Sequence, residues 1–174
     1  MTKSEQGRYI ILGSIDGILA VLGGVIGAST AGTPNEGVVH VGIGVAVALA
    51  VTNGIGSYLA ESTVEYAKLA EKERPLLRRL TGTKIERVTK RKIYLDSITH
   101  GGASFVGSLV PIVPFMTIES NALAVSIAAS LSALVVLGIY SGRLSKQNIV
   151  VSVVKMVILG VLVVVLVSLL GCGH

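Results

Sequence analysis

The feature that most constrains this chain is a series of five long apolar stretches separated by short polar segments. Each stretch is near the length of about 20 residues that an α-helix needs to cross a bilayer. Hydrophobic residues make up 51% of the 174 residues and charged residues only 14%, which is too apolar for a water-soluble domain. We therefore expect one all-α, polytopic membrane domain over residues 1–174, with spans at about 9–31, 38–66, 98–118, 122–140 and 149–170.

The same sequence argues against a cleaved signal peptide, an internal disulfide and an enzyme active site. The first stretch is too long for the apolar part of a signal peptide and contains Asp16, so we expect it to remain as a helix. The single cysteine, Cys172, excludes an internal disulfide, and Cys172 with His174 at the chain end is poor evidence for a metal site. No nucleophile, cofactor motif or paired acid and base is visible, so we expect no enzyme and no permanently bound cofactor.

The basic residues predict the orientation of the chain in the membrane. Lysine and arginine in short loops resist translocation and mark the cytosolic side. Of the 15 basic residues, 14 fall on one side of the five spans, so we expect a cytosolic N-terminus and an external C-terminus. They are Lys3, Arg8, Lys68, Lys72, Arg74, Arg78, Arg79, Lys84, Arg87, Lys90, Arg91, Lys92, Arg143 and Lys146.

Residues 67–96 form the one cytosolic connection long enough to hold structure of its own. Breaks at Pro75 and at residues 81–83, with helix-compatible sequence on both sides, predict a short helical hairpin. Ten basic and four acidic residues give this segment a net charge of +6. We expect it to contact anionic lipid headgroups. A nucleic-acid partner is not expected, because one tyrosine supplies no stacking platform.

Asp16 is the most informative polar residue, because it lies deep within the first span. An ionisable side chain near the bilayer centre costs roughly 2.5–3.5 kcal/mol and is a functional candidate by default. Gly13 and Gly17 beside it allow another helix to approach closely. A transported cation or proton would compensate the carboxylate. The alternatives are a permanently protonated carboxyl or a fixed ion pair with Lys155, whose long side chain can instead extend to the cytosolic surface.

Four polar residues of the second span recur every fourth position and therefore share one face of a helix. They are Asn53, Ser57, Glu61 and Glu65. Counted from the outer ends of the two spans, Asn53 lies at the depth of Asp16, and the two glutamates lie nearer the cytosol. Such a series of hard oxygen ligands suits magnesium, manganese or ferrous iron. We predict a metal site made by Asp16 with these four residues.

The third span adds one titratable residue and two prolines. His100 lies near the cytosolic boundary and is a candidate ligand or proton relay. Pro111 and Pro114 are expected to bend the helix, which either exposes coordinating carbonyl oxygens or only improves packing.

Motifs along nearly the whole chain resemble the vacuolar iron transporter (VIT) family. They are Ile15-Asp16-Gly17-Ile18-Leu19, Gly56-Ser57-Tyr58, the double-proline segment Gly107 to Phe115, and a last helix that contains Gly160. The resemblance implies a homodimer that exports ferrous iron, and often manganese, from the cytosol in exchange for protons. It also implies that Asp16 binds metal and proton.

The sequence departs from that family in two places. Ser57 occupies the position of a usual glutamate, and Glu61 lies one helical turn farther toward the cytosol as its possible replacement. Larger relatives carry a metal-collecting domain after the second span, and here the basic segment retains only Glu71 and Glu73 as candidates for metal capture.

The resulting prediction is a multi-pass exporter of Fe²⁺ or Mn²⁺ that exchanges metal for protons, placed in a cell membrane rather than an organelle. The competing interpretation is a membrane scaffold or regulator without transport activity. In that case the basic hairpin binds lipid or a protein partner, and Asp16 pairs with Lys155.

Overall fold

The fold is an assembly of five long helices, as a computed structural model shows for residues 3–76, 81–145 and 148–171. All five helices are long and apolar enough to cross a membrane. No strand occurs in these ranges, so the all-α prediction is confirmed. The helices are α1 (Lys3–Thr30), α2 (Asn35–Leu76), α3 (Lys84–Thr117), α4 (Ala122–Leu144) and α5 (Ile149–Gly171).

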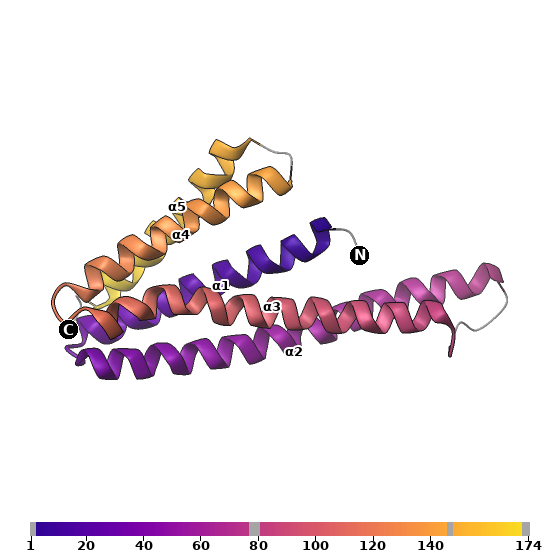
Figure 1. The fold of residues 1–174 in the computed structure, drawn as a ribbon, viewed down its shortest axis with the longest axis horizontal. Coiled ribbons are helices and arrows are strands. Elements are labelled where there is room, and N and C mark those ends of the chain that lie inside the picture. The colour runs from indigo at the N-terminus through magenta and orange to yellow at the C-terminus, as the bar shows by residue number, and fades with distance from the viewer. Residues whose placement is uncertain (1–2, 77–80, 146–147, 172–174) are drawn as a thin grey trace.

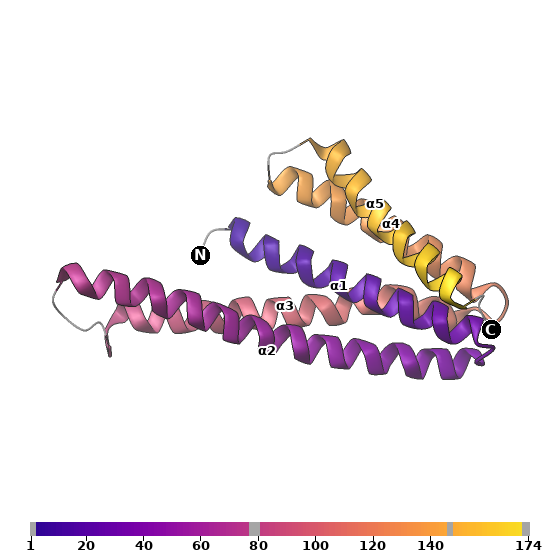
Figure 2. The ribbon, with the colours of Figure 1, turned by 180° about the vertical axis from the view of Figure 1, so that it is seen from behind.

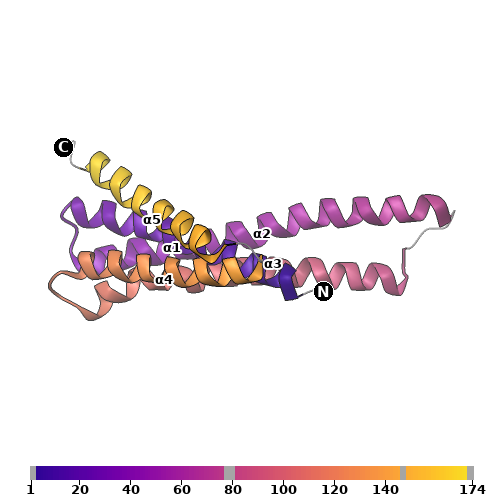
Figure 3. The ribbon, with the colours of Figure 1, turned by 90° about the horizontal axis from the view of Figure 1, so that it is seen from above.

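The helices form two groups that meet at one end of the molecule. α2 and α3 make a long antiparallel hairpin, and α1 packs along it (Figure 1). α4 and α5 form a second, shorter hairpin that diverges from α1 toward the end where the N-terminus lies (Figures 1 and 2). Seen from above, the tip of the α2–α3 hairpin extends far beyond the other helices (Figure 3). The two chain ends lie at opposite ends of the bundle, as five spans require.

The predicted cytosolic hairpin is a continuation of α2 and α3 rather than a separate pair of helices. α2 has 42 residues, which at 1.5 Å per residue is about 63 Å, twice the thickness of a bilayer core of about 30 Å. α2 continues through Pro75 to Leu76 before it ends. Gly82 then adopts a φ of +77°, and the Thr83 side chain accepts a hydrogen bond from the Glu86 amide at the start of α3.

The apolar core occupies the half of the bundle that is remote from this hairpin. Its fully buried members come from α1, α2 and α3, and α4 adds Ala122. They include Val21, Leu22, Val25, Ile26, Val38, Ala46 and Ile112. Many leucine, valine and isoleucine side chains elsewhere are exposed, especially on α5. Lipid is the medium that would cover such a surface, because a water-soluble protein rarely exposes so large an apolar area.

Glycines bring α1 into backbone contact with α3. A Cβ atom added at Gly17 would lie 2.0 Å from the Ser104 carbonyl oxygen, and one at Gly13 would lie 2.4 Å from that of His100. On α3, a Cβ atom at Gly107 would meet the Ser14 oxygen at 2.5 Å. The predicted close approach at Gly13 and Gly17 is therefore confirmed. Its partner is α3 of the same chain.

The prolines of α3 lie in the half of the bundle that holds the apolar core, remote from the tip of the α2–α3 hairpin. α3 continues through Pro111 and Pro114 to Thr117. The Pro111 carbonyl oxygen accepts a 2.7 Å hydrogen bond from Ser126 Oγ, which joins α3 to α4. These contacts support a packing role for the double-proline segment. Its bending of the helix and any effect on coordinating oxygens stay predictions.

We expect Gly17→Ala to destabilise the protein by about 1–3 kcal/mol, because the added methyl group overlaps backbone rather than a movable side chain. Gly44→Ala is the matched control, since a Cβ atom there meets no described atom within 4 Å. Thermal unfolding of both variants in detergent measures the difference. Equal stability of the two variants would contradict the close α1–α3 contact.

Candidate functional site

The polar face of α2 points toward α1 and α3, and it forms the wall of a continuous polar region. Each of its four members contacts a different partner. Asn53 contacts Asp16 and Ser104, Ser57 contacts His100, Glu61 contacts Tyr9, and Glu65 contacts Lys92. The spacing of four residues therefore predicted the correct face. The region divides into an inner site around Asp16 and an outer pocket around the two glutamates.

The inner site brings α1, α2 and α3 together at Asp16. Asn53 Nδ2 donates to Ser104 Oγ at 2.8 Å and lies 3.4 Å from Asp16 Oδ2. The predicted equal depth of Asp16 and Asn53 is thus observed. The Asp16 side chain is 41% exposed, so one side of the carboxylate faces its neighbours and the other is open.

His100 is buried beside Asp16. Its Nε2 atom lies 3.7 Å from Asp16 Oδ2, and its Nδ1 atom is hydrogen-bonded to Ser57 Oγ. The Tyr9 ring contacts the imidazole with a centroid distance of 5.8 Å. The sequence suggested only a position near the boundary, whereas packing against α1 makes His100 a central member of the site.

The outer pocket is a cavity of about 470 Å³ between α1, α2 and α3, on the side of Asp16 that faces the tip of the α2–α3 hairpin. It is lined by three acids and three bases, together with Tyr9 and Val64. These charged residues are Arg8, Glu61, Glu65, Lys68, Lys92 and Asp96. The opposite charges cancel, so the lining has no formal net charge.

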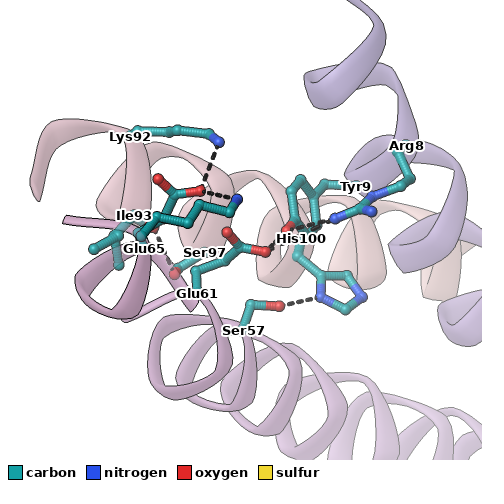
Figure 4. A network of polar contacts seen from close by, with 10 residues as sticks. Arg8, Tyr9, Ser57, Glu61, Glu65, Lys92, Ile93, Ser97 and His100 are labelled. Atoms are coloured by element: carbon teal, nitrogen blue, oxygen red, sulfur yellow. Dashed lines mark hydrogen bonds and ion pairs between the residues drawn. The ribbon is translucent and has the colours of Figure 1, made fainter. Parts of the chain in front are cut away.

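Glu61 accepts a hydrogen bond from the Tyr9 hydroxyl, which in turn accepts one from Arg8 Nη2 at 2.9 Å (Figure 4). Glu65 lies one turn farther along α2. Its Oε1 atom accepts a hydrogen bond from Lys68 Nζ at 2.9 Å. The same atom accepts one from Lys92 Nζ at 3.0 Å (Figure 4). Both glutamates are therefore largely compensated by protein cations or donors.

Tyr9 separates the outer pocket from the inner site. Its side chain is 5% exposed, its hydroxyl group binds Glu61, and its ring lies against His100. A solute that passes between the two regions along this face of α2 must therefore pass Tyr9.

The structure separates other predicted residues from this region. Glu71 is exposed and Glu73 half-buried on the last turns of α2, with Glu71 about 15 Å along the helix from Glu61. Lys155 is exposed on α5, and the Asp16 carboxylate lies instead beside His100 and Asn53. Cys172 and His174 lie outside the described residues. Among the described residues, no three histidine, cysteine, aspartate or glutamate side chains converge as they would in a preformed metal centre.

α3 contributes residues that the sequence reasoning missed. Asp96, which was assigned to the cytosolic segment, is fully buried and lines the outer pocket. Ser104 and Ser108 are also fully buried, and Ser108 Oγ lies 3.3 Å from the Gly17 carbonyl oxygen. Asp96, His100, Ser104 and Ser108 recur at every fourth position of α3. That spacing was a readable signal of a polar face on α3, matching the one on α2.

The sequence of this chain is similar to a known protein family and to individual proteins. A model of the VIT family matches residues 78–172, more than half of the chain. An uncharacterized protein of Methanocaldococcus jannaschii is 33% identical over 160 residues, which cover 89% of this chain and 83% of that protein. Vacuolar iron transporter 1 of Tulipa gesneriana is 26% identical over 207 aligned positions, covering 92% of this chain and 84% of the tulip protein. That alignment is longer than this chain, so the tulip protein carries residues that are absent here.

We expect Tyr9→Phe to lower stability by about 1–3 kcal/mol, because it removes the buried donor to the Glu61 carboxylate. Arg8→Gln should cost no more than about 1 kcal/mol, since Arg8 is 68% exposed and 3.8 Å from Glu61. Unfolding in detergent compares the two variants. A larger loss for Arg8→Gln would show that the surface ion pair, rather than the tyrosine, holds Glu61.

Proposed function

The chain belongs to the VIT family, and we propose that it is a membrane transporter that exports a divalent metal cation, ferrous iron or manganese, from the cytosol in exchange for protons. The observation that carries this proposal is Asp16, a carboxylate within a spanning helix, at the inner end of a polar face that leads to the basic end of the bundle. A membrane protein maintains such a costly arrangement where a charged solute passes.

In the proposed mechanism, the cation enters the outer pocket, where Glu61 and Glu65 draw it from the cytosol. It then passes Tyr9 and is bound by Asp16 with Asn53 and Ser57. Because no three acidic, histidine or cysteine side chains of the described residues converge at this point, the metal would retain some of its water ligands. Loose binding of this kind suits a transported cation, which must also leave.

Proton exchange follows from the same carboxylate. Asp16 cannot hold a divalent cation and a proton on the same oxygen atoms at once. A proton that arrives from the far side therefore favours release of the metal there. The predicted relay role of His100 would place a second proton acceptor beside Asp16.

A homodimer is supported by the open side of Asp16. Its side chain is 41% exposed in the single chain. The exposed part of the carboxylate would face hydrocarbon if no other group covered it. A second copy is the partner that we propose. Gly13 and Gly17 already contact α3 of the same chain, so the contact between the two copies must use other residues.

The orientation proposed from the sequence places the α2–α3 hairpin in the cytosol. Its exposed bases include Lys84, Arg87 and Arg91, which surround Val88. Each basic residue near an anionic leaflet contributes about 1 kcal/mol of attraction. We propose that the hairpin contacts anionic headgroups of the cell membrane and that Glu71 and Glu73 capture metal ahead of the outer pocket.

The scaffold interpretation has less support. It requires Asp16 to be neutralised by Lys155, and the structure pairs Asp16 with His100 and Asn53 while Lys155 is exposed on α5. Replacing Asp16 and Lys155 together by alanine and leucine would preserve function under the scaffold interpretation and abolish it under the transport proposal.

We expect Asp16→Asn to reduce Fe²⁺ and Mn²⁺ flux in proteoliposomes by at least about tenfold, because a loss of about 1.4 kcal/mol in metal binding corresponds to a tenfold change. Wild-type flux should depend on an imposed pH gradient. Glu36→Gln is the control, because this carboxylate lies in the first turn of α2 at the opposite end from the outer pocket. Wild-type rates in Asp16→Asn would refute the mechanism, and flux that ignores the pH gradient would refute proton exchange.

We expect Glu61→Gln to raise the KM for metal by roughly 3–10-fold with little change in the maximal rate, because an entry carboxylate raises the local cation concentration. Glu65→Gln should have a smaller effect, since Lys68 and Lys92 already compensate Glu65. Measuring the flux of each variant against metal concentration at low ionic strength gives the two KM values. An unchanged KM in both variants would exclude the outer pocket from the path.

A further inference from the structure

The imidazole of His100 has one nitrogen atom whose partner is missing from the described residues. The His100 side chain is 9% exposed, and its Nε2 atom is buried with no hydrogen-bond partner. A buried polar nitrogen without a partner is destabilising, because it has lost its hydrogen bonds to water and gained none in the protein. The nearest charged atom is Asp16 Oδ2 at 3.7 Å, which is beyond hydrogen-bond distance.

The rest of the ring is held in place from three sides. Nδ1 is bonded to Ser57 Oγ on α2, and the Tyr9 ring lies against the imidazole. On α1, a Cβ atom added at Gly13 would lie 3.0 Å from His100 Cδ2, so the ring is in close contact with the helix that carries Asp16. A histidine that binds metal through one nitrogen usually donates from the other to a nearby oxygen, most often of a carboxylate, a carbonyl group or water, and this fixes its tautomer. In this structure the Ser57 hydroxyl oxygen occupies that position.

The gap between the two atoms fits a metal ion better than a direct contact. With ligand distances of about 2.1 Å, two ligands of a tetrahedral metal are about 3.4 Å apart. The observed 3.7 Å separation of Nε2 and Oδ2 needs only a small adjustment to reach that value. Asn53 lies at the same carboxylate oxygen, and rotation of its amide would turn Oδ1 toward the ion.

We infer that His100 Nε2 and Asp16 Oδ2 bind the transported cation together, and that this nitrogen ligand makes the inner site select later transition metals over manganese and magnesium. Imidazole binds iron, cobalt, nickel and zinc well, whereas manganese and magnesium prefer sites made of oxygen alone. The inference rests on the proposed function, because it concerns the same cation at Asp16. It adds His100 of α3 to the metal site, and it predicts which divalent metals the site binds more tightly.

The first test looks for the imidazole directly, with Co²⁺ as the probe. The chain has three histidines, so the double variant His40→Gln/His174→Gln leaves His100 as the sole source of an imidazole signal. The full-length protein, purified without a histidine tag, is loaded with Co²⁺ and measured by X-ray absorption. We expect the outer-shell scattering of one imidazole ring. A cobalt site with oxygen ligands only would overturn the inference.

The second test measures selectivity. We expect His100→Gln to weaken Co²⁺ binding by about tenfold or more and Mn²⁺ binding by less than about threefold, as loss of a nitrogen ligand predicts. Flux of the two ions in proteoliposomes should shift in the same direction. His40→Gln is the matched control, because that histidine is exposed and bonds the Glu36 carbonyl oxygen at 2.7 Å.

The outcomes distinguish the inference from the proposed function. Wild-type flux with an unchanged Co²⁺/Mn²⁺ ratio in His100→Gln would overturn the role of His100 and leave transport intact. A wild-type protein that neither binds nor moves a divalent cation would overturn both. If His100→Gln fails to fold, the X-ray absorption spectrum of the double variant decides.

Discussion

The contact between the backbones of α1 and α3 is the constraint on which the rest of the site depends. Gly13 and Gly17 on one helix, with Gly107 on the other, leave no room for a side chain between them. This close approach places Asp16 against His100 and leaves Tyr9 between the inner site and the outer pocket. A larger residue at any of these positions would move α1 outward and separate the carboxylate from the imidazole.

The close packing also explains how an apolar bundle holds so many polar groups. Serine hydroxyl groups on α3 donate hydrogen bonds to backbone carbonyl oxygens of the same helix. Ser104 Oγ, for example, donates to the His100 carbonyl oxygen at 2.9 Å. Glu65 is compensated by lysines, and Glu61 by Tyr9. The polar region is thus largely satisfied within the protein, which is the condition under which a membrane tolerates it. In the inner site, as far as the structure describes it, the open side of Asp16 and Nε2 of His100 can still accept a ligand.

Spacing and length predicted much of this arrangement, and the reason is geometric. A residue every fourth position shares a helix face, and equal counts from the outer ends give equal depth, so the meeting of Asp16 with Asn53 followed from the sequence. The same reasoning applied to α3 would have found Asp96, His100 and Ser104. Asp96 was instead assigned to a solvated cytosolic segment, because a charge at the end of an apolar run usually marks the boundary of a span.

The sequence by itself determined the five apolar helices and the polar face of α2, and it marked Asp16 as the candidate site residue, because these depend on composition and on periodicity within one helix. The tertiary structure alone decided the partners: His100 rather than Lys155 beside Asp16, and Tyr9 on Glu61. It also showed that the predicted cytosolic hairpin continues α2 and α3. Such pairings depend on how each helix is rotated and how closely it packs, and a sequence read one helix at a time does not contain that rotation.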